Sequence, residues 1–434
     1  MIYSKKNKVM KNLSIYTGIF LILLIHSSCL EEVSLNTPYQ GYTPQETGDS
    51  WIISTPEAEN MDSSIITRVY RDLYNDARYP TIRSLLIVRN GRLVAESYCK
   101  SANDLYSLHN IKSATKSITS ILTGILLDMG ELDSLESRLS DYMPGYFDDN
   151  PKKREITLKH VLTMETGLHF DDNVHTREML YNRGSSLKYV LEKKLVFDPG
   201  SGWYYGDGNP QLVSGLIWEL TGKSESEFAE EYLFAPLSIT DYHWEITHDG
   251  LTLGSIGLWL TPRDMAKIGL LMARRGAWEG SQVVSEAWVE ESTRRQSSFS
   301  NYGYYWYPIE DKAFYAEGHG GQLIWVYPDY DLVIVITSDP YTKSWKLSEP
   351  YTEIFAKILS SLQDLLLTGQ IDESIDLTVN PGPSNSVQLD HHILNNYENE
   401  NCITLHTGFP LSNIKRSNNY NRKDPGYRIL LLGW

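Results

Sequence analysis

Residues 111–130, which read IKSATKSITSILTGILLDMG, decide how the rest of the chain is interpreted. Apolar side chains recur in this stretch at steps of three and four residues, the spacing of one face of an α-helix. They are Ile118, Ile121, Leu122, Ile125, Leu126 and Met129. Gly130 follows them, and glycine commonly ends a helix. The stretch therefore predicts a helix that starts near Ser113 and carries Ser113 and Lys116 on one face.

A serine and a lysine at this spacing are candidates for a nucleophile and the base that activates it. A serine hydroxyl is a poor nucleophile until a neighbour takes its proton, and a lysine does so only when its surroundings favour the neutral amine. The free N–H groups of a helix N-terminus also stabilise a developing oxyanion. The structural alternative is that Ser113 caps the helix and Lys116 is solvated.

The Ser-x-x-Lys spacing alone is weak evidence, because it occurs three times in this chain. The other two pairs are Ser185/Lys188 and Ser412/Lys415. Ser185 lacks a strong apolar period after it, and Ser412 lies in an Asn-rich tail. Only Ser113 opens a well-marked amphipathic helix, so the helical context singles out the first pair.

Strand patterns lie on both sides of a largely helical body. The apolar runs 84–88 and 93–97 flank Asn90-Gly91, a strong hairpin signal. The runs 322–327 and 332–337 flank a second turn. Helical patterns occupy 157–164, 211–220, 262–275 and 351–367. We expect an α/β (α+β) fold, in which both chain ends build one antiparallel sheet flanked by helices, with an inserted all-helical region.

The amino-acid composition excludes several classes of function. The 434 residues include 41% hydrophobic and 22% charged residues, which is typical of a globular protein. The net charge of -16 disfavours binding to nucleic acid, whose phosphates are negative. The sequence contains no C-x-x-C or H-E-x-x-H motif, so nothing indicates a metal site.

The first thirty residues have the pattern of an export signal. Four lysines precede an apolar run, Leu13–Ile25, and Ser27 and Ser28 then precede Cys29. This arrangement resembles a bacterial lipobox, in which the cysteine is lipidated, although His26 departs from the usual pattern. The alternatives are an ordinary secretory signal or an uncleaved anchor. We expect a lipid anchor at Cys29 that holds the protein to a membrane of the bacterial cell envelope.

Several segments together resemble the penicillin-recognising serine hydrolases. This family includes class C β-lactamases, D-amino-acid carboxypeptidases, esterases and 6-aminohexanoate-dimer hydrolases. The run 111–130 resembles its active-site helix, and the segments 156–168, 199–215 and 258–276 agree in the same order. The resemblance covers about residues 60–367 and implies a β-lactamase/DD-peptidase-like fold, with no metal or cofactor.

The domain organisation follows from these patterns. Residues 1–29 are the expected signal peptide and residues 30–60 a polar tether. Residues 61–370 form the expected serine hydrolase domain. Residues 371–434 are Asn-rich, and we interpret them as a flexible tail or an atypical extra module.

The family's second motif, Tyr-x-Asn, is matched in part. Tyr205 stands at its tyrosine, and near Lys116 a phenol can serve as general base and then acid. A packed aromatic is the alternative. Gly206-Asp207 stands where Ser-Asn is common, and the charge of Asp207 favours the protonated lysine. Asn209 is a candidate for the missing amide, and both residues are candidates for substrate binding.

The family's third motif is Lys-Thr-Gly or His-x-Gly. Matching the latter are Gly318, His319, Gly320, Gly321 and Gln322. The resemblance implies an oxyanion hole formed by the N–H groups of Gln322 and Ser113, and such donors are worth about 2.7–4 kcal/mol each. A plain loop histidine is the alternative. A histidine is mostly uncharged at neutral pH, which favours esters or amides over β-lactams with their carboxylate. Trp259 is a candidate pocket residue.

The sequence thus predicts a serine hydrolase that cleaves a small ester, amide or peptide-like substrate through an acyl-enzyme on Ser113. Lys116 and Tyr205 relay the proton. One alternative is a non-catalytic, penicillin-binding-like surface protein, which Asp207 keeps open. Another is a peptidoglycan D-amino-acid peptidase. The oligomeric state stays open.

Overall fold

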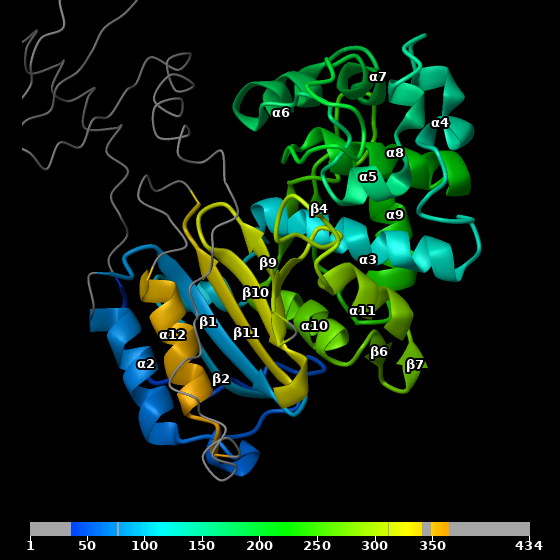
Figure 1. Cartoon of the computed structure of the whole chain (residues 1–434). Coiled ribbons are helices and arrows are strands. Elements are labelled where there is room, and N and C mark those ends of the chain that lie inside the picture. Colours follow the sequence, from blue (N-terminus) through cyan, green and yellow to red (C-terminus); the bar gives the residue numbers. More distant parts are fainter. Residues whose placement is uncertain (1–35, 76–77, 311, 341–348, 364–434) are drawn as a thin grey trace, which may run out of the picture. The chain divides into compact units, whose positions relative to one another are not determined.

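The computed structural model describes residues 36–75, 78–310, 312–340 and 349–363. A six-stranded antiparallel sheet lies at its centre, with the strand order β2-β1-β11-β10-β9-β8 (Figure 1). The strands are β1 (Ile82–Arg89), β2 (Arg92–Tyr98), β8 (Tyr307–Ile309), β9 (Ala313–Gly318), β10 (Gln322–Tyr327) and β11 (Leu332–Ser338). Strand β1 pairs directly with β11, so the two ends of the domain share one sheet, as the sequence predicted.

Both predicted hairpins are present. Asn90 and Gly91 join β1 to β2 with φ values of +53° and +70°, the left-handed conformation that such turns require. The 3₁₀ turn η8 (Pro328–Tyr330) joins β10 to β11. The sequence did not predict a third hairpin, in which β9 pairs with β10 and Gln322 lies opposite Gly318.

Helices cover both faces of this sheet (Figure 1). Helices α2 (Ser63–Asn75) and α12 (Glu349–Ser360) pack on one face, where the Trp325 and Phe355 rings lie 4.1 Å apart. Helix α10 (Pro262–Ala273) packs on the other face. A Cβ on Gly269 would lie 2.4 Å from Val333 Cγ1, so glycine permits the close approach of α10 to the sheet.

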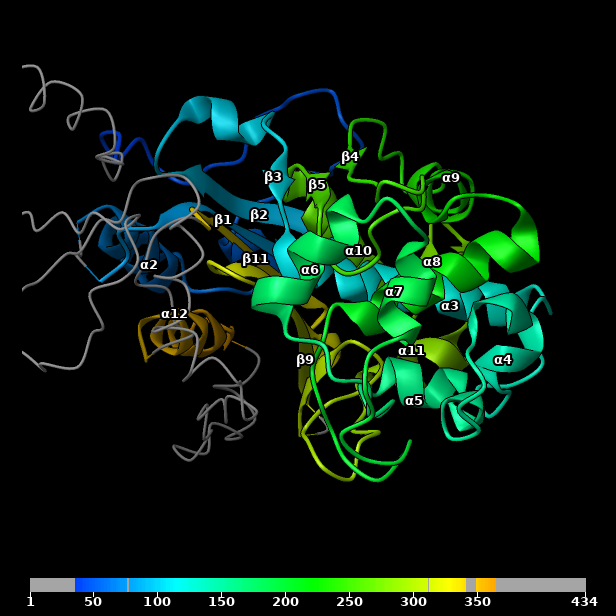
Figure 2. The same cartoon turned by 90° about the horizontal axis from the view of Figure 1, so that it is seen from above.

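The remaining helices form the expected inserted region (Figure 2). They are α3 (Thr115–Asp128), α4 (Leu139–Tyr142), α5 (Leu158–Leu162), α6 (Asp172–Tyr181), α7 (Ser186–Leu191), α8 (Gly208–Thr221), α9 (Glu225–Ala229) and α11 (Glu286–Thr293). Helix α3 lies innermost, with twelve of its fourteen residues buried. A helix surrounded by protein needs apolar or paired side chains on every face. The insertion is not purely helical, since it contains β3 (His109–Asn110), β4 (His243–Trp244), β5 (Leu258–Leu260), β6 (Ala277–Trp278) and β7 (Ser281–Gln282).

Residues 36–60, expected to belong to a tether, pack along the domain instead. The Leu93 N–H of β2 donates to Ile52 O at 2.9 Å, and Trp51 is 7% exposed. Arg263 of α10 pairs with Asp49 at 2.7 Å. The polar composition of this stretch concealed these contacts, because several of them use backbone groups.

The two ends of the chain lie outside the described residues. These ends include Cys29, with the expected signal peptide, and residues 371–434. Helix α12 ends at Ser360, short of the predicted limit at residue 367. Among the described residues, no helix is long and apolar enough to cross a membrane.

Candidate active site

Ser113 lies in η4 (Lys112–Ala114), a 3₁₀ turn that leads directly into α3. Lys112 has a left-handed backbone with a φ of +53°, and its N–H donates to Asn110 Oδ1 at 2.8 Å. Residues other than glycine rarely adopt this conformation, and such strain is concentrated at functional sites. The turn leaves the Ser113 side chain partly exposed ahead of the helix.

The hairpin of β9 and β10 packs against this turn. A Cβ on Gly318 would lie 2.0 Å from Ile111 O, so only glycine permits the approach of the strand. Gln322 begins β10, and its side-chain amide donates to Ser338 O at 2.7 Å. The turn of the hairpin consists of His319, Gly320 and Gly321. The structure thus brings the predicted glycine-rich segment to the turn that carries Ser113.

The charge of Lys112 reaches His319 across this contact. Desolvation lowers the pKa of His319, and the positive charge of Lys112 lowers it further. Burial likewise lowers the pKa of Lys112, while Glu245 opposes that shift. A mostly uncharged histidine was expected at this position, and the lowered pKa of His319 agrees with that expectation.

Lys116 is 1% exposed, and its amine is held by three acceptors. The Nζ atom donates to Ser113 Oγ at 3.1 Å, to Asp207 Oδ1 at 2.6 Å and to Ser255 O at 3.1 Å. An ammonium has three protons, so this arrangement satisfies all of them. The structure therefore contradicts the alternative of a solvated lysine. It equally contradicts Ser113 as a cap, since the residue preceding α3 is Ala114 and makes no side-chain capping bond.

Asp207 faces Lys116 rather than open space. It is 4% exposed, and Thr176 Oγ1 donates to its other carboxyl oxygen at 2.6 Å. The Asp207 N–H donates to Asp172 Oδ1 at 2.7 Å. Burial, and then the charge of Asp207, raise the pKa of Asp172 well above its usual value. Asp207, predicted to bind substrate, thus has both carboxyl oxygens engaged inside the protein.

Tyr205 completes the predicted group. Its ring centroid lies 4.9 Å from Lys116 Nζ. Burial and the charge of Asp207 raise the pKa of Tyr205 well above its usual value, whereas a hydrogen bond with Ser113 lowers it. The structure therefore joins a hydroxyl, an amine and a phenol that lie up to ninety-two residues apart in the sequence.

Asn209 and Trp259 lie outside this group. Thr166 donates to Asn209 Oδ1 at 2.8 Å, and Asn209 Nδ2 contacts Met164 Sδ at 3.1 Å, so no described contact joins this amide to Lys116. Trp259 Nε1 donates to Glu245 at 3.3 Å. Both remain candidates for substrate binding.

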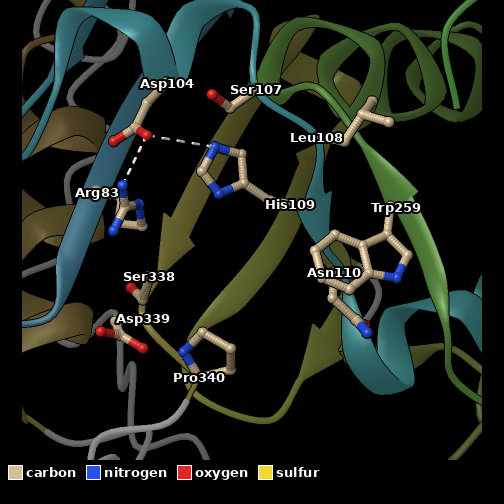
Figure 3. Close-up of a pocket in the computed structure, with 10 residues that line it drawn as sticks. All are labelled: Arg83, Asp104, Ser107, Leu108, His109, Asn110, Trp259, Ser338, Asp339 and Pro340. Atoms are coloured by element: carbon tan, nitrogen blue, oxygen red, sulfur yellow. Dashed lines mark hydrogen bonds and ion pairs between the residues drawn. The ribbon is translucent and has the colours of Figure 1, made fainter. Parts of the chain in front are cut away.

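Trp259 lines a pocket of about 300 Å³ (Figure 3). In Figure 3, Arg83 and His109 both point toward Asp104, and Trp259 lies on the opposite side. The Arg83–Asp104 ion pair is 2.7 Å long. The other lining residues are Ser107, Leu108, Asn110, Ser338, Asp339 and Pro340. Asn110 and Ser338 connect this pocket to the segments that carry Ser113 and Gln322.

Several groups at this site could not be recognised from sequence motifs. Lys112 had no signal beyond its position before Ser113, and Asp172 lies in a polar stretch without a motif. Ser255 contributes only a backbone oxygen, which a sequence does not reveal. Glu317 lies two residues before the predicted His319, and this closeness to the motif is the one sequence feature that could have indicated its place at the site. Among the described residues, no cluster of three or more His, Cys, Asp or Glu side chains could hold a metal.

Comparison with known proteins identifies the family. The Beta-lactamase family model matches residues 75–347. The chain belongs to the Beta-lactamase family. A curated relative, the 6-aminohexanoate-dimer hydrolase of Paenarthrobacter ureafaciens, is 25% identical over 299 residues, which are 60% of this chain and 74% of the relative. The lovastatin esterase of Penicillium rubens is 30% identical over 192 residues, 39% of this chain and 47% of that enzyme.

Solved structures agree on the fold of this Beta-lactamase family member. A family VIII carboxylesterase superposes with a TM-score of 0.57 at 16% identity, covering 72% of this chain and 99% of that chain. The family and these relatives establish a serine hydrolase, as the sequence predicted.

Proposed function

We propose that this protein hydrolyses an ester or amide bond in two steps through an acyl-enzyme on Ser113. One observation carries the proposal: Ser113 Oγ lies 3.1 Å from the amine of the buried Lys116. Tyr205 contacts the same hydroxyl. This is the mutual geometry expected of a nucleophile with its proton-transfer partners.

Asp207 pairs with the Lys116 amine at 2.6 Å, and burial keeps the Tyr205 phenol neutral. Lysine acts as a base only as the neutral amine, so the reaction starts from that form. The neutral amine then takes the proton of Ser113 as Oγ bonds to the carbonyl carbon. Tyr205 is placed to donate its proton to the departing alcohol or amine and to regain one from Lys116. Water releases the acyl group by the reverse relay.

The oxyanion of this reaction needs two donors. The N–H groups of Ser113 and Gln322 are our candidates, because η4 and the first residue of β10 pack together. Backbone donors at fixed positions stabilise developing charge without reorganisation.

Covalent labelling tests the proposal. The purified protein is incubated with a fluorophosphonate, and intact mass followed by peptide mapping locates the adduct. We expect one adduct on Ser113, hydrolysis of a p-nitrophenyl ester, and loss of both in Ser113→Ala. An active, labelled Ser113→Ala protein with an intact fold would refute the assignment.

A non-catalytic surface protein is the second candidate, and the 2.6 Å contact between Lys116 and Asp207 favours it, since a charged lysine cannot act as a base. Such a protein would give no adduct on Ser113 at any pH. A peptidoglycan D-amino-acid peptidase would give the adduct and would hydrolyse D-Ala-D-Ala peptides faster than short esters. The same labelling and substrate pair separate all three.

We also propose that the protein is lipid-anchored at Cys29 in the bacterial cell envelope. The proposal rests on the basic and apolar segments that precede this cysteine. Expression in a bacterium with labelled fatty acid tests it. We expect label and membrane association in the parent protein and their loss in Cys29→Ala.

A further inference from the structure

An acidic residue that the proposed reaction does not use lies beside the catalytic group. Glu317 is the penultimate residue of β9, just before the hairpin turn that holds His319. Its side chain is partly exposed, and no hydrogen bond or ion pair joins it to any described residue. Burial alone raises the pKa of Glu317 to about 7. A partly buried carboxylate without a partner is costly, and such groups are concentrated at functional sites.

Aromatic rings surround this carboxyl group. Residues alternate between the two faces of a strand, so Glu317 shares its face with Tyr315, which stacks on Tyr307 at 5.1 Å. Tyr307 lies 4.9 Å from Tyr302, which in turn lies 6.3 Å from Tyr205. The carboxylate is close enough to raise the pKa of all four phenols.

Trp203 extends this aromatic surface toward the nucleophile. Its ring lies 6.2 Å from Tyr205 and 5.9 Å from Tyr302. Trp203, Tyr205 and Tyr307 are each only partly buried. Tyr205 also contacts Ser113, which places the surface next to the reacting hydroxyl.

We propose that Glu317 and this aromatic surface bind a cationic group of the substrate, such as an alkylammonium near the scissile bond. A cation is attracted to aromatic faces, tryptophan above all, and to a carboxylate without a counter-ion. The two cations of the site are already engaged, Lys116 with Asp207 and Lys112 with the charge of Glu245. This inference rests on the proposed function and names the substrate class of that site.

Two matched esters test the proposal. One is the p-nitrophenyl ester of trimethylammoniobutanoate, and the other is its neutral isostere, in which carbon replaces the ammonium nitrogen. We expect the parent protein to prefer the cationic ester in kcat/KM by about tenfold. In Glu317→Gln this preference should disappear through loss on the cationic ester alone. The control Glu165→Gln removes another partly buried carboxyl group with a raised pKa, bonded to Ser297 and Thr163, and should keep the preference.

The pH dependence gives a second readout. The titratable groups facing Glu317 are Tyr205, Tyr302, Tyr307 and Tyr315, which burial keeps neutral. The preference should therefore grow as the pH rises through about 7, where Glu317 loses its proton. Should Glu317→Gln fail to fold, Trp203→Leu carries the same test, since it removes the ring while the carboxylate remains.

The possible outcomes distinguish a failure of the proposed cation site from a failure of the proposed hydrolase activity. Equal rates on the two esters, or an equal loss on both in Glu317→Gln, would overturn the cation site and leave the hydrolase intact. The second of these results would assign Glu317 a role in proton transfer. No turnover of either ester and no adduct on Ser113 would overturn the hydrolase, and the cation site with it.

Discussion

Two helices of this protein begin at a Ser-x-x-Lys spacing, and the structure uses the two pairs differently. Ser185 is the N-cap of α7, where its hydroxyl accepts the Lys188 N–H at 3.3 Å while the Lys188 side chain is exposed. Ser113 precedes α3 in a 3₁₀ turn, and Lys116 is buried with its amine on the Ser113 hydroxyl. One pair closes a helix end, and the other places a buried amine next to the hydroxyl of the proposed nucleophile.

The difference lies in the surroundings of each helix. Helix α7 buries one face, so Lys188 reaches water. Helix α3 is enclosed by protein, so Lys116 must satisfy its charge from Ser113, Asp207 and Ser255 O. A buried ammonium is tolerated only with such partners. The tertiary environment, rather than the tetrapeptide, creates the chemistry.

The largest expected effect is the difference in ester hydrolysis between variants that lack one lysine or the other. Lys116→Met should reduce kcat/KM for a p-nitrophenyl ester by about a hundredfold or more, because proton transfer by a placed side chain contributes that much. Lys188→Met, the matched control, should leave the rate unchanged. A stopped assay with both variants at equal concentration measures this contrast, and comparable losses in the two would show that neither pair is catalytic.

A second contrast concerns Asp207, the partner that Lys188 lacks. Asp207→Asn removes the negative charge that pairs with the buried Lys116 amine at 2.6 Å. We expect the free energy of unfolding to fall by about 3–5 kcal/mol, the cost of leaving one charge of a buried pair without its partner. Urea unfolding of the parent and the variant measures this loss, and an unchanged free energy of unfolding would mean that the pair does not stabilise the fold.

The sequence predicted the fold well where local pattern and tertiary structure agree. Asn90-Gly91 fixed the first hairpin, and the periodicity of 118–129 marked α3. Strand β9 was missed, because its alternation is blurred by burial of nearly every residue. Residues 36–60 were misjudged for a related reason, since their attachment to β2 runs through backbone bonds that any sequence can make.

Sequence motifs predicted which residues would form the candidate site, but they did not predict the charged residues that surround it. The predicted catalytic residues Ser113, Lys116 and Tyr205 lie together in the structure. Their electrostatic partners were not found, because Asp172 and Glu317 approach the group only through long-range folding. The pairing of Asp207 with Lys116 was anticipated, whereas Asn209 turned toward Thr166 instead.

A smaller effect should appear in stability, from a buried carboxyl group that contacts α3. Thr119 of α3 donates to Glu225 Oε1 at 2.6 Å, and burial raises the pKa of Glu225 from 4.5 to about 8. Between these values the folded protein keeps a proton that the unfolded chain has released, so stability falls as the pH rises through that window.

Glu225→Gln keeps the shape and removes this titration. Between pH 5 and pH 8 the parent should lose on the order of 2 kcal/mol of unfolding free energy relative to the variant. Urea unfolding of both proteins at the two pH values measures the difference. Parallel pH dependence in the two would show that Glu225 does not hold its proton in the folded state.

The smallest expected effect is a loss of stability on replacing Ser185, the serine of the surface pair. Ser185→Ala removes the oxygen that accepts the Lys188 N–H, and losing an N-cap costs about 1 kcal/mol. The ester hydrolysis rate should not change, and the midpoint of urea unfolding should fall slightly with the same slope. A Ser185→Ala variant that is as stable as the parent but slower on esters would contradict this assignment. The surface pair Ser185/Lys188 would then take part in the reaction, and the buried pair Ser113/Lys116 would need another explanation.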